Sequence, residues 1–163
     1  MFLASRLTGF NAGVSRLQLA GYKTLSCAGV SAAQNISITG LTGRDPQAGD
    51  VVVIAWGATS ATDFALDITG YVEVCDLYQN DQFDSNFGVF LKVLSAADTT
   101  AELSATQNDR TNTLVIQCWA GVNTTTPQDA AATTAGGVNA NEPDPAAITP
   151  VTPGAVVLVF AHS

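Results

Sequence analysis

The sequence contains little of what an enzyme active site needs. Its 163 residues include one histidine, His162, and no G-x-S-x-G motif. The sequence therefore does not indicate a catalytic triad of nucleophile, histidine and acid. A phosphate-binding glycine loop followed by lysine is also missing. We therefore predict a protein that has no catalytic residues and that binds no cofactor.

Acidic side chains that could cooperate are few and lie in polar loops, where solvated carboxylates are ordinary. Two close pairs could suggest glycoside hydrolysis, Asp81 with Asp84 and Glu142 with Asp144. Calcium needs about six to eight oxygen ligands, and residues 76–86 have neither EF-hand spacing nor a glycine for its sharp turn. We predict no metal site. The oxygen-bearing candidates considered were Asp76, Asn80, Asp81, Asp84 and Asn86.

Long hydrophobic runs and closely spaced cysteines are missing as well. No apolar stretch approaches the length of about 20 residues that crosses a bilayer, and residues 8–11 interrupt any signal-peptide core. Cys27, Cys75 and Cys118 are odd in number, far apart and set in strand-like stretches. This pattern favours buried free thiols over a disulfide or a zinc site. We expect a soluble chain with no membrane partner.

Basic residues are scarce, with 6 Lys and Arg against 14 Asp and Glu, and the net charge is −8. Residues 1–44 hold four basic side chains and no acid, whereas residues 45–163 hold all 14 acids and only Lys92 and Arg110. The acidic body disfavours binding to nucleic acid phosphates. The basic arm suggests docking on an acidic protein surface, such as a neighbouring subunit; the alternative is that its charges only aid solubility.

Short strand-like runs separated by turn residues take the place of helical periodicity. Residues 50–57, DVVVIAWG, are almost continuously apolar, as in a strand covered on both faces. Residues 86–94 alternate, with Phe87, Val89, Leu91 and Val93 on one face. The pattern predicts an all-β, two-sheet antiparallel β-sandwich, jelly-roll-like, with an N-terminal arm. The expected strands are residues 35–39, 50–57, 71–78, 86–94, 100–106, 112–121 and 155–162.

The chain divides by composition into an N-terminal arm or edge strands, residues 1–33, and a β-sandwich domain, residues 34–163. Within that domain, residues 123–153 are rich in Thr, Ala, Gly, Asn and Pro. Connections of this length are uncommon in compact domains and are often functional or interface loops.

A turn followed by an apolar run occurs twice. Aligning Gly49 with Gly154 places Val51–Ile54 over Val156–Val159. The second copy predicts another core strand directly before Ser163, where we would expect a polar and exposed chain end.

Several apolar residues are expected to face outwards and to need a partner. On the sandwich these are Phe90, Val115 and Trp119, and on the arm apolar groups flank Arg6 and Arg16. Self-contacts of this kind predict a closed oligomer, with a homotrimer expected. The candidate subunit-interface residues are Phe2, Leu3, Arg6, Phe10, Arg16, Phe90, Val115 and Trp119.

Four stretches over about residues 34–163 resemble bacteriophage and prophage β-sandwich virion structural proteins of the capsid decoration or tail appendage type. They are DPQAGDVVVIAWG, GVFLKVLSAADTTAELSAT, LVIQCWAGVN and AAITPVTPGAVVLVF. The resemblance implies a virion protein that binds other virion subunits, with no catalytic residues. Such proteins usually continue with another hairpin. Either a C-terminal portion is missing from this sequence, or the final strand completes a sheet at a subunit contact.

Three functions compete at this point. The first is a capsid decoration (cement) protein that binds and stabilises neighbouring subunits, with a tail or baseplate appendage as its variant. The second is a carbohydrate-binding module that uses exposed aromatics, although both tryptophans lie in apolar strands, which favours burial. The third, an esterase or glycosidase, needs a site that the sequence does not show. The aromatic candidates for sugar stacking are Trp56, Tyr71, Tyr78 and Trp119.

Overall fold

The computed structural model describes residues 16–27, 33–80, 84–105, 112–136 and 145–161. All regular secondary structure within these residues is β-strand, which confirms the predicted all-β class. The strands are β1 (Gln18–Cys27), β2 (Gln34–Ser37), β3 (Thr42–Gly43), β4 (Val51–Thr59), β5 (Leu66–Ile68), β6 (Val72–Gln79), β7 (Ser85–Val93), β8 (Thr100–Ala105) and β9 (Asn112–Ala120).

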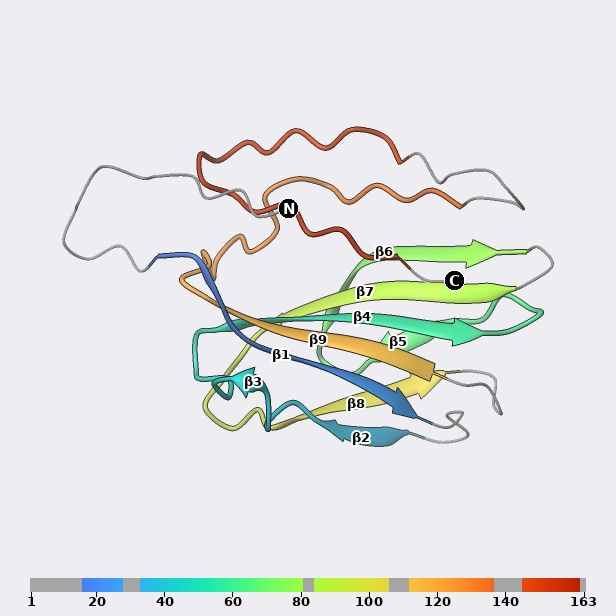
Figure 1. Cartoon of the computed structure of the whole chain (residues 1–163), viewed down its shortest axis with the longest axis horizontal. Coiled ribbons are helices and arrows are strands. Elements are labelled where there is room, and N and C mark those ends of the chain that lie inside the picture. The colour runs from blue at the N-terminus through green and yellow to red at the C-terminus, as the bar shows by residue number, and fades with distance from the viewer. Residues whose placement is uncertain (1–15, 28–32, 81–83, 106–111, 137–144, 162–163) are drawn as a thin grey trace.

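The strands form two antiparallel sheets, which confirms the two-sheet β-sandwich. The larger sheet has the order β3-β1-β9-β4-β7-β6 and the smaller one the order β2-β8-β5 (Figure 1). Strands from opposite ends of the chain are neighbours, since β1 pairs with β9 and β2 with β8. The finer assignment to a jelly roll stays a prediction.

Six of the seven expected strands are present, and the seventh prediction is wrong. Residues 155–161 form no strand in the structure. We did not predict β5 or the two-residue β3 from the sequence. Strand β1 lies within the residues that we assigned to an arm or edge strands, and it is second from the edge, between β3 and β9.

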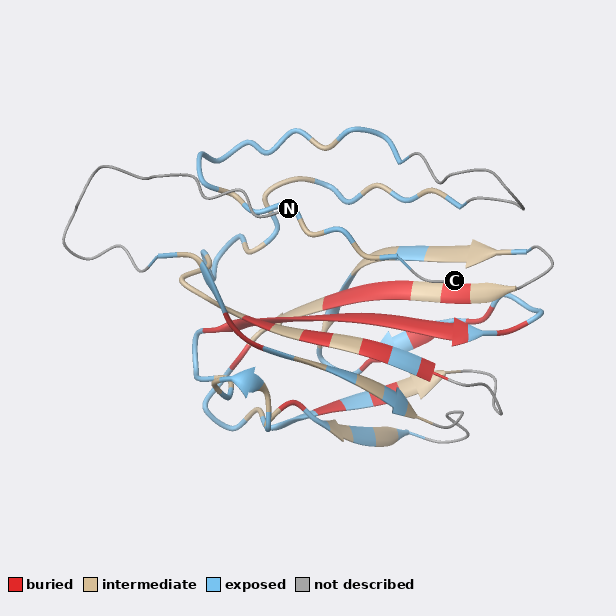
Figure 2. Cartoon of the chain, in the orientation of Figure 1, coloured by how far each residue is buried: buried red, intermediate tan, exposed pale blue. Residues whose placement is uncertain are grey.

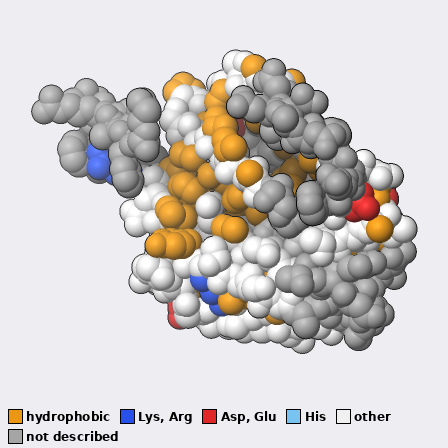
Figure 3. All heavy atoms as spheres, turned by 45° about the vertical axis from the view of Figure 1, so that its right-hand side comes forward, with side chains coloured by type: hydrophobic (Ala, Val, Ile, Leu, Met, Phe, Trp, Pro, Cys, Tyr) orange, Lys and Arg blue, Asp and Glu red, His pale blue; other side chains and the backbone are white. Residues whose placement is uncertain are grey.

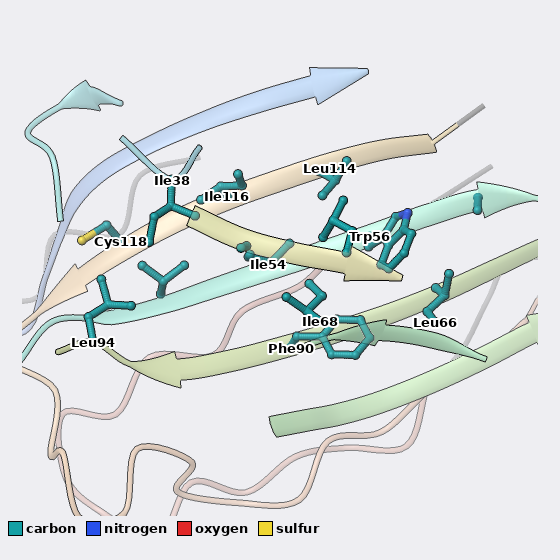
Figure 4. Packing of buried hydrophobic residues seen from close by; sticks show 14 of the residues in the cluster. Ile38, Ile54, Trp56, Leu66, Ile68, Phe90, Leu94, Leu114, Ile116 and Cys118 are labelled. Carbon is teal, nitrogen blue, oxygen red and sulfur yellow. The ribbon is translucent and has the colours of Figure 1, made fainter. Parts of the chain in front are cut away.

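The main core lies between the two sheets. Ile54 and Trp56 on β4 and Leu114 on β9 face Leu66 and Ile68 of the smaller sheet, all at 0–5% exposure (Figure 4). The indole Nε1 of Trp56 donates a hydrogen bond of 2.8 Å to Oδ1 of Asn112. A buried indole N–H that found no acceptor would cost free energy, so this bond fixes the position of Trp56 in the core.

Strand β4 is the central, doubly covered strand that its apolar run predicts. It lies between β7 and β9, and eight of its nine residues are buried (Figure 2). Because successive side chains of a strand point to opposite faces, Val52 and Ile54 enter the main core, whereas Val51 and Val53 point the other way. A strand buried on only one face would not need this continuous run.

Candidate interaction surface

The larger sheet has a second apolar face, which points away from the smaller sheet. We call it the outer face. At its centre Val51, Val53, Ala55 and Val89 are 3–8% exposed. Half-buried apolar side chains surround this centre, and they come from β6, β7, β9 and the chain beyond β9. They are Val74, Cys75, Phe87, Leu91, Val93, Val115, Trp119, Val122, Leu158 and Phe160.

Residues 155–161, which we call the C-terminal segment, cover part of this outer face. Leu158 and Phe160 pack against its apolar cluster. The residues directly before and after Leu158 point away, and these two, Val157 and Val159, are 50% and 85% exposed. Among the described residues, the segment's only backbone–backbone hydrogen bond is the one from Ala155 N to Thr152 O, 3.2 Å. An extended apolar segment on a sheet face thus replaces the predicted core strand.

The turn that precedes the C-terminal segment matches the turn that precedes β4. In the first turn Asp50 N donates to Gln47 O at 3.0 Å, and in the second Ala155 N donates to Thr152 O at 3.2 Å. The third residue of each turn is a glycine with positive φ, 87° at Gly49 and 85° at Gly154. Glycine adopts this left-handed conformation without steric cost. The sequence repeat therefore reproduces the turn but not the strand.

The chain between β9 and the C-terminal segment forms two extended limbs, residues 121–136 and 145–152, which run alongside each other (Figure 1). Thr133 Oγ1 donates to the carbonyl of Ala146 at 2.8 Å. The carboxylate of Asp129 accepts from the N–H groups of Val151 at 2.6 Å and Thr152 at 3.1 Å. These hydrogen bonds, led by those from Thr152, lower the pKa of Asp129. The limbs are thus joined by side chain–backbone bonds rather than by a ladder.

The interface residues that we predicted on the sandwich divide between the two faces. Val115 and Trp119 lie on the outer face and are half-buried, and Trp119 Nε1 donates to Gln117 Oε1 at 3.0 Å. The prediction that Phe90 faces outwards is wrong. Phe90 is 1% exposed in the main core, with its ring centroid 6.4 Å from that of Trp56. Both faces of β7 are apolar because both are covered, so alternation alone could not orient this strand.

The arm residues that we predicted to be at an interface mostly lie outside the described residues. This holds for Phe2, Leu3, Arg6 and Phe10. Arg16 is described, and it is an exposed residue two positions before β1.

Sequence reasoning placed Leu19 only among the apolar groups that flank Arg16 on the arm, and it missed Tyr22. On β1 these two residues are 42% and 48% exposed. Their strand neighbours on β9 are Trp119 and Gln117, respectively, so both lie beside the outer-face residues of β9. A β-bulge between Leu19 and Gly21 breaks the period-two alternation. Without that alternation, no pattern in the sequence placed Leu19 and Tyr22 on one face.

A polar cluster centred on the buried carboxylate of Asp50 ties the base of β4 to β9 and to the loop before β4. Asp50 accepts from Arg44 Nη1 and Nη2 at 2.6 and 2.9 Å, from Gln47 N at 2.8 Å and from Cys118 Sγ at 3.3 Å. Burial would raise the pKa of Asp50, but these donors outweigh it and hold the pKa below its ordinary value. Burial and the Asp50 carboxylate raise the pKa of Cys118 to about 12. The thiol therefore stays protonated and unreactive, and the cluster is structural.

One residue considered for metal binding, Asn86, is committed to hydrogen bonds with the backbone. Asn86 is fully buried; its Oδ1 accepts from Phe64 N and its Nδ2 donates to Thr62 O, both at 3.1 Å. Asp81 lies outside the described residues. Within the part of the chain that the structure describes, no three His, Cys, Asp or Glu side chains gather to hold a metal ion. All three cysteines are free, as predicted; Cys118 is buried, while Cys27 and Cys75 are half-buried.

The remaining candidates for catalysis or sugar binding lie only partly within the described residues. His162, Glu142 and Asp144 lie outside the described residues. Trp56 is fully buried, as predicted for a tryptophan in an apolar strand, and the hydroxyl of Tyr71 is buried. Tyr78 is half-buried on β6, and Trp119 is the tryptophan that reaches the outer face.

Comparison with known proteins yields no relative. No family model matches the chain, and no match was found among curated proteins or among solved structures. No helix within the described residues is long and apolar enough to span a bilayer.

Proposed function

We propose that this chain is a non-enzymatic structural subunit of a bacteriophage virion, a capsid decoration protein that binds and stabilises neighbouring subunits. The observation that carries the proposal is the exposed apolar surface of the C-terminal segment. Val156, Val157 and Val159 are 49%, 50% and 85% exposed, beside an outer sheet face that is itself apolar. Contiguous exposed apolar side chains of this kind mark protein interaction sites.

The distribution of side chains agrees with a contact surface. Hydrophobic side chains gather in one region of the molecule in the view of Figure 3. Burying apolar surface in a contact contributes about 25 cal/mol per Å². On a particle that repeats the subunit many times, avidity makes weak individual contacts sufficient.

The assignment to a virion rests on the four stretches that resemble bacteriophage structural proteins. Two of them contain most of strands β4 and β9, which form the centre of the larger sheet, and a third includes most of the C-terminal segment. The resemblance fits a capsid decoration protein and a tail or baseplate appendage alike. We place the protein on the capsid because the exposed apolar surface suits the bridging of adjacent subunits.

Antibody labelling tests this function. An antibody raised against the purified protein is applied to virus particles from cells that express it, and labelled particles are imaged by electron microscopy. Regularly spaced label on the heads is the expected result. Label confined to tails would transfer the function to a tail or baseplate appendage, and particles without label would reject a virion role.

A pair of variants tests the surface itself. Val157→Ser combined with Val159→Ser should reduce incorporation into particles, because the exposed apolar contact is lost. Thr100→Ser is the control, since Thr100 is exposed on β8 of the smaller sheet, away from the outer face. Equal incorporation of the two variants would argue against the C-terminal segment as the contact.

Saccharide binding is a second candidate, favoured by one observation. Tyr22, Gln117 and Trp119 share the outer face: Tyr22 pairs with Gln117, and Trp119 is hydrogen-bonded to Gln117. Aromatic rings beside an amide suit the apolar faces and the hydroxyl groups of a sugar. Titration with a panel of oligosaccharides, followed by tryptophan fluorescence, decides the matter. A response that Trp119→Ala abolishes supports binding, and no response at millimolar sugar rejects it.

A further inference from the structure

The β1–β9 corner of the outer face carries an apolar patch. It consists of Leu19 and Tyr22 on β1 with Val115 and Trp119 on β9, and we call it the β1–β9 patch. In the register of the sheet Leu19 pairs with Trp119, and Tyr22 lies between Val115 and Trp119 on the neighbouring strand. Val115 and Trp119 are half-buried, whereas Leu19 and Tyr22 are 42% and 48% exposed.

The C-terminal segment accounts for only part of the cover on this face. Leu158 and Phe160 pack against the cluster to which Val115 and Trp119 belong, and Leu19 and Tyr22 are not part of that cluster. A large aliphatic and a large aromatic side chain thus lie side by side in water at the edge of a covered apolar face. Further burial would be favourable here.

Fifteen residues of chain that lie outside the described residues join the protein at this same corner. Residues 1–15 precede Arg16, and β1 then begins with Gln18 paired to Ala120, next to the pair of Leu19 and Trp119. An extended segment of this length reaches about 50 Å. It is therefore long enough to cross from one subunit to the next.

The composition of residues 1–15 suits an apolar patch on an acidic body. Their one charged side chain is Arg6, and six of the fifteen are large and apolar. Residues 45–163 carry a net charge of −12, which attracts a basic segment over a distance. Charge would steer the encounter and apolar contacts would hold it. The large apolar residues are Met1, Phe2, Leu3, Leu7, Phe10 and Val14.

We propose that residues 1–15 of one copy dock on the β1–β9 patch of a neighbouring copy. This inference rests on the proposed function and names the partner of that surface as the protein itself. The segment leaves each subunit at the edge of the patch, so one contact, repeated by rotation, closes a ring of identical subunits. The segment has too few residues to form a core of its own and would gain one on the neighbour.

Two variants and their mixture test the contact. The first lacks residues 2–14, which keeps β1 intact, and the second carries Leu19→Ser with Tyr22→Ser. Sedimentation velocity over a range of concentrations should show that each variant associates at least tenfold more weakly than the unaltered protein. The mixture should form a heterodimer, because the first variant supplies an intact patch and the second an intact segment.

The controls separate lost contact from lost folding. Val151→Ser is the matched surface change, because Val151 is 80% exposed on the second limb, and it should leave association unchanged. Circular dichroism melts should agree among all variants. If the double variant fails to fold, the single variants Leu19→Gln and Tyr22→Ser replace it in the sedimentation experiment.

Three outcomes would overturn the inference. Unchanged association of the deletion variant shows that residues 2–14 make no contact between copies. Two weakened variants that fail to combine show that the segment and the patch do not bind each other. The third outcome is a monomeric protein in which the deletion increases the quenching of Trp119 fluorescence by acrylamide, while the fluorescence of buried Trp56 is unchanged. This result would show that residues 2–14 cover the patch of their own chain.

Antibody labelling of particles separates this inference from the proposed function. Labelled particles without any contact between segment and patch reject the inference alone. A confirmed contact without labelled particles rejects the virion role alone.

Discussion

Arg44 and Asp50 form a bidentate ion pair at the base of the central strand, with Nη–Oδ distances of 2.6 and 2.9 Å. The Asp50 side chain is 8% exposed and that of Arg44 is 34% exposed, so the carboxylate is buried while the guanidinium reaches water. Asp50 also accepts from Gln47 N and from the thiol of Cys118, which links the turn before β4 to β9. Four donors on one carboxylate make this pair a structural anchor.

Replacing Asp50 should destabilise the sandwich. Asp50→Asn keeps the size of the side chain but removes the charge, and we expect a loss of about 2 kcal/mol in the free energy of unfolding. Removing one partner of a fully buried ion pair lowers the free energy of unfolding by about 3–5 kcal/mol, and we expect less here because Arg44 is partly exposed. Urea denaturation measures the change. Asp67→Asn, at an exposed position of β5, is the control and should leave stability near that of the unaltered protein.

Stability should fall in acid, and Asp98 should account for part of the fall. Hydrogen bonds from Lys92 and from Ser95 lower the pKa of Asp98 from 3.8 to about 2. A pKa that is lower in the folded state means that the unfolded chain binds the proton first, so the stabilisation is present above about pH 4 and is lost towards pH 2. Denaturation midpoints measured from pH 6 down to pH 2 should decline less steeply for Asp98→Asn than for the unaltered protein. Parallel curves for the two proteins would contradict this.

A charge in the middle of β4 should unfold the domain. Val52 is fully buried, and an unpaired carboxylate at that position costs several kcal/mol against a total stability of about 5–15 kcal/mol. Val52→Asp should therefore lack a cooperative thermal transition by circular dichroism. Val159→Asp introduces the same group at a site that is 85% exposed and should melt as the unaltered protein does. A cooperative melt of Val52→Asp near the normal temperature would contradict the burial of this side chain.

Cys118 should resist thiol reagents in the native protein. It is fully buried, and its pKa is raised to about 12, so almost no thiolate forms at pH 8. Mass spectrometry after alkylation at pH 8 should find Cys118 unmodified until denaturant is added. Cys118→Ser should then show the same number of native-state modifications as the unaltered protein, and one fewer after unfolding.

Much of the fold could be predicted because its signals are local. The apolar run of β4 predicted a strand covered on both faces, and Val51 and Val52 indeed lie in two separate apolar clusters. Turn residues between alternating runs placed β2, β6, β7, β8 and β9 close to their observed bounds. Each of these features depends on side-chain period and turn chemistry within a few residues, which the sequence states directly.

The interaction surface was harder to predict, because it depends on which face a neighbour covers. Phe90 alternates with Val89 on β7, and both are apolar, so the pattern could not say that Phe90 faces the core. Leu19 was assigned only to the arm and Tyr22 escaped notice, because the bulge on β1 shifts the alternation by one residue. Only the pairing of β1 with β9 placed them beside Trp119.

The two turn-and-run units show most directly where the sequence is decisive and where it is not. Gly49 and Gly154 adopt nearly the same positive φ because a four-residue turn is determined by its own residues. The apolar runs that follow take different structures: β4 pairs with β7 and β9, whereas residues 155–161 lie across the outer face of the sheet. A strand needs partners for its backbone hydrogen bonds as well as a suitable sequence, and tertiary structure supplies those partners only to β4.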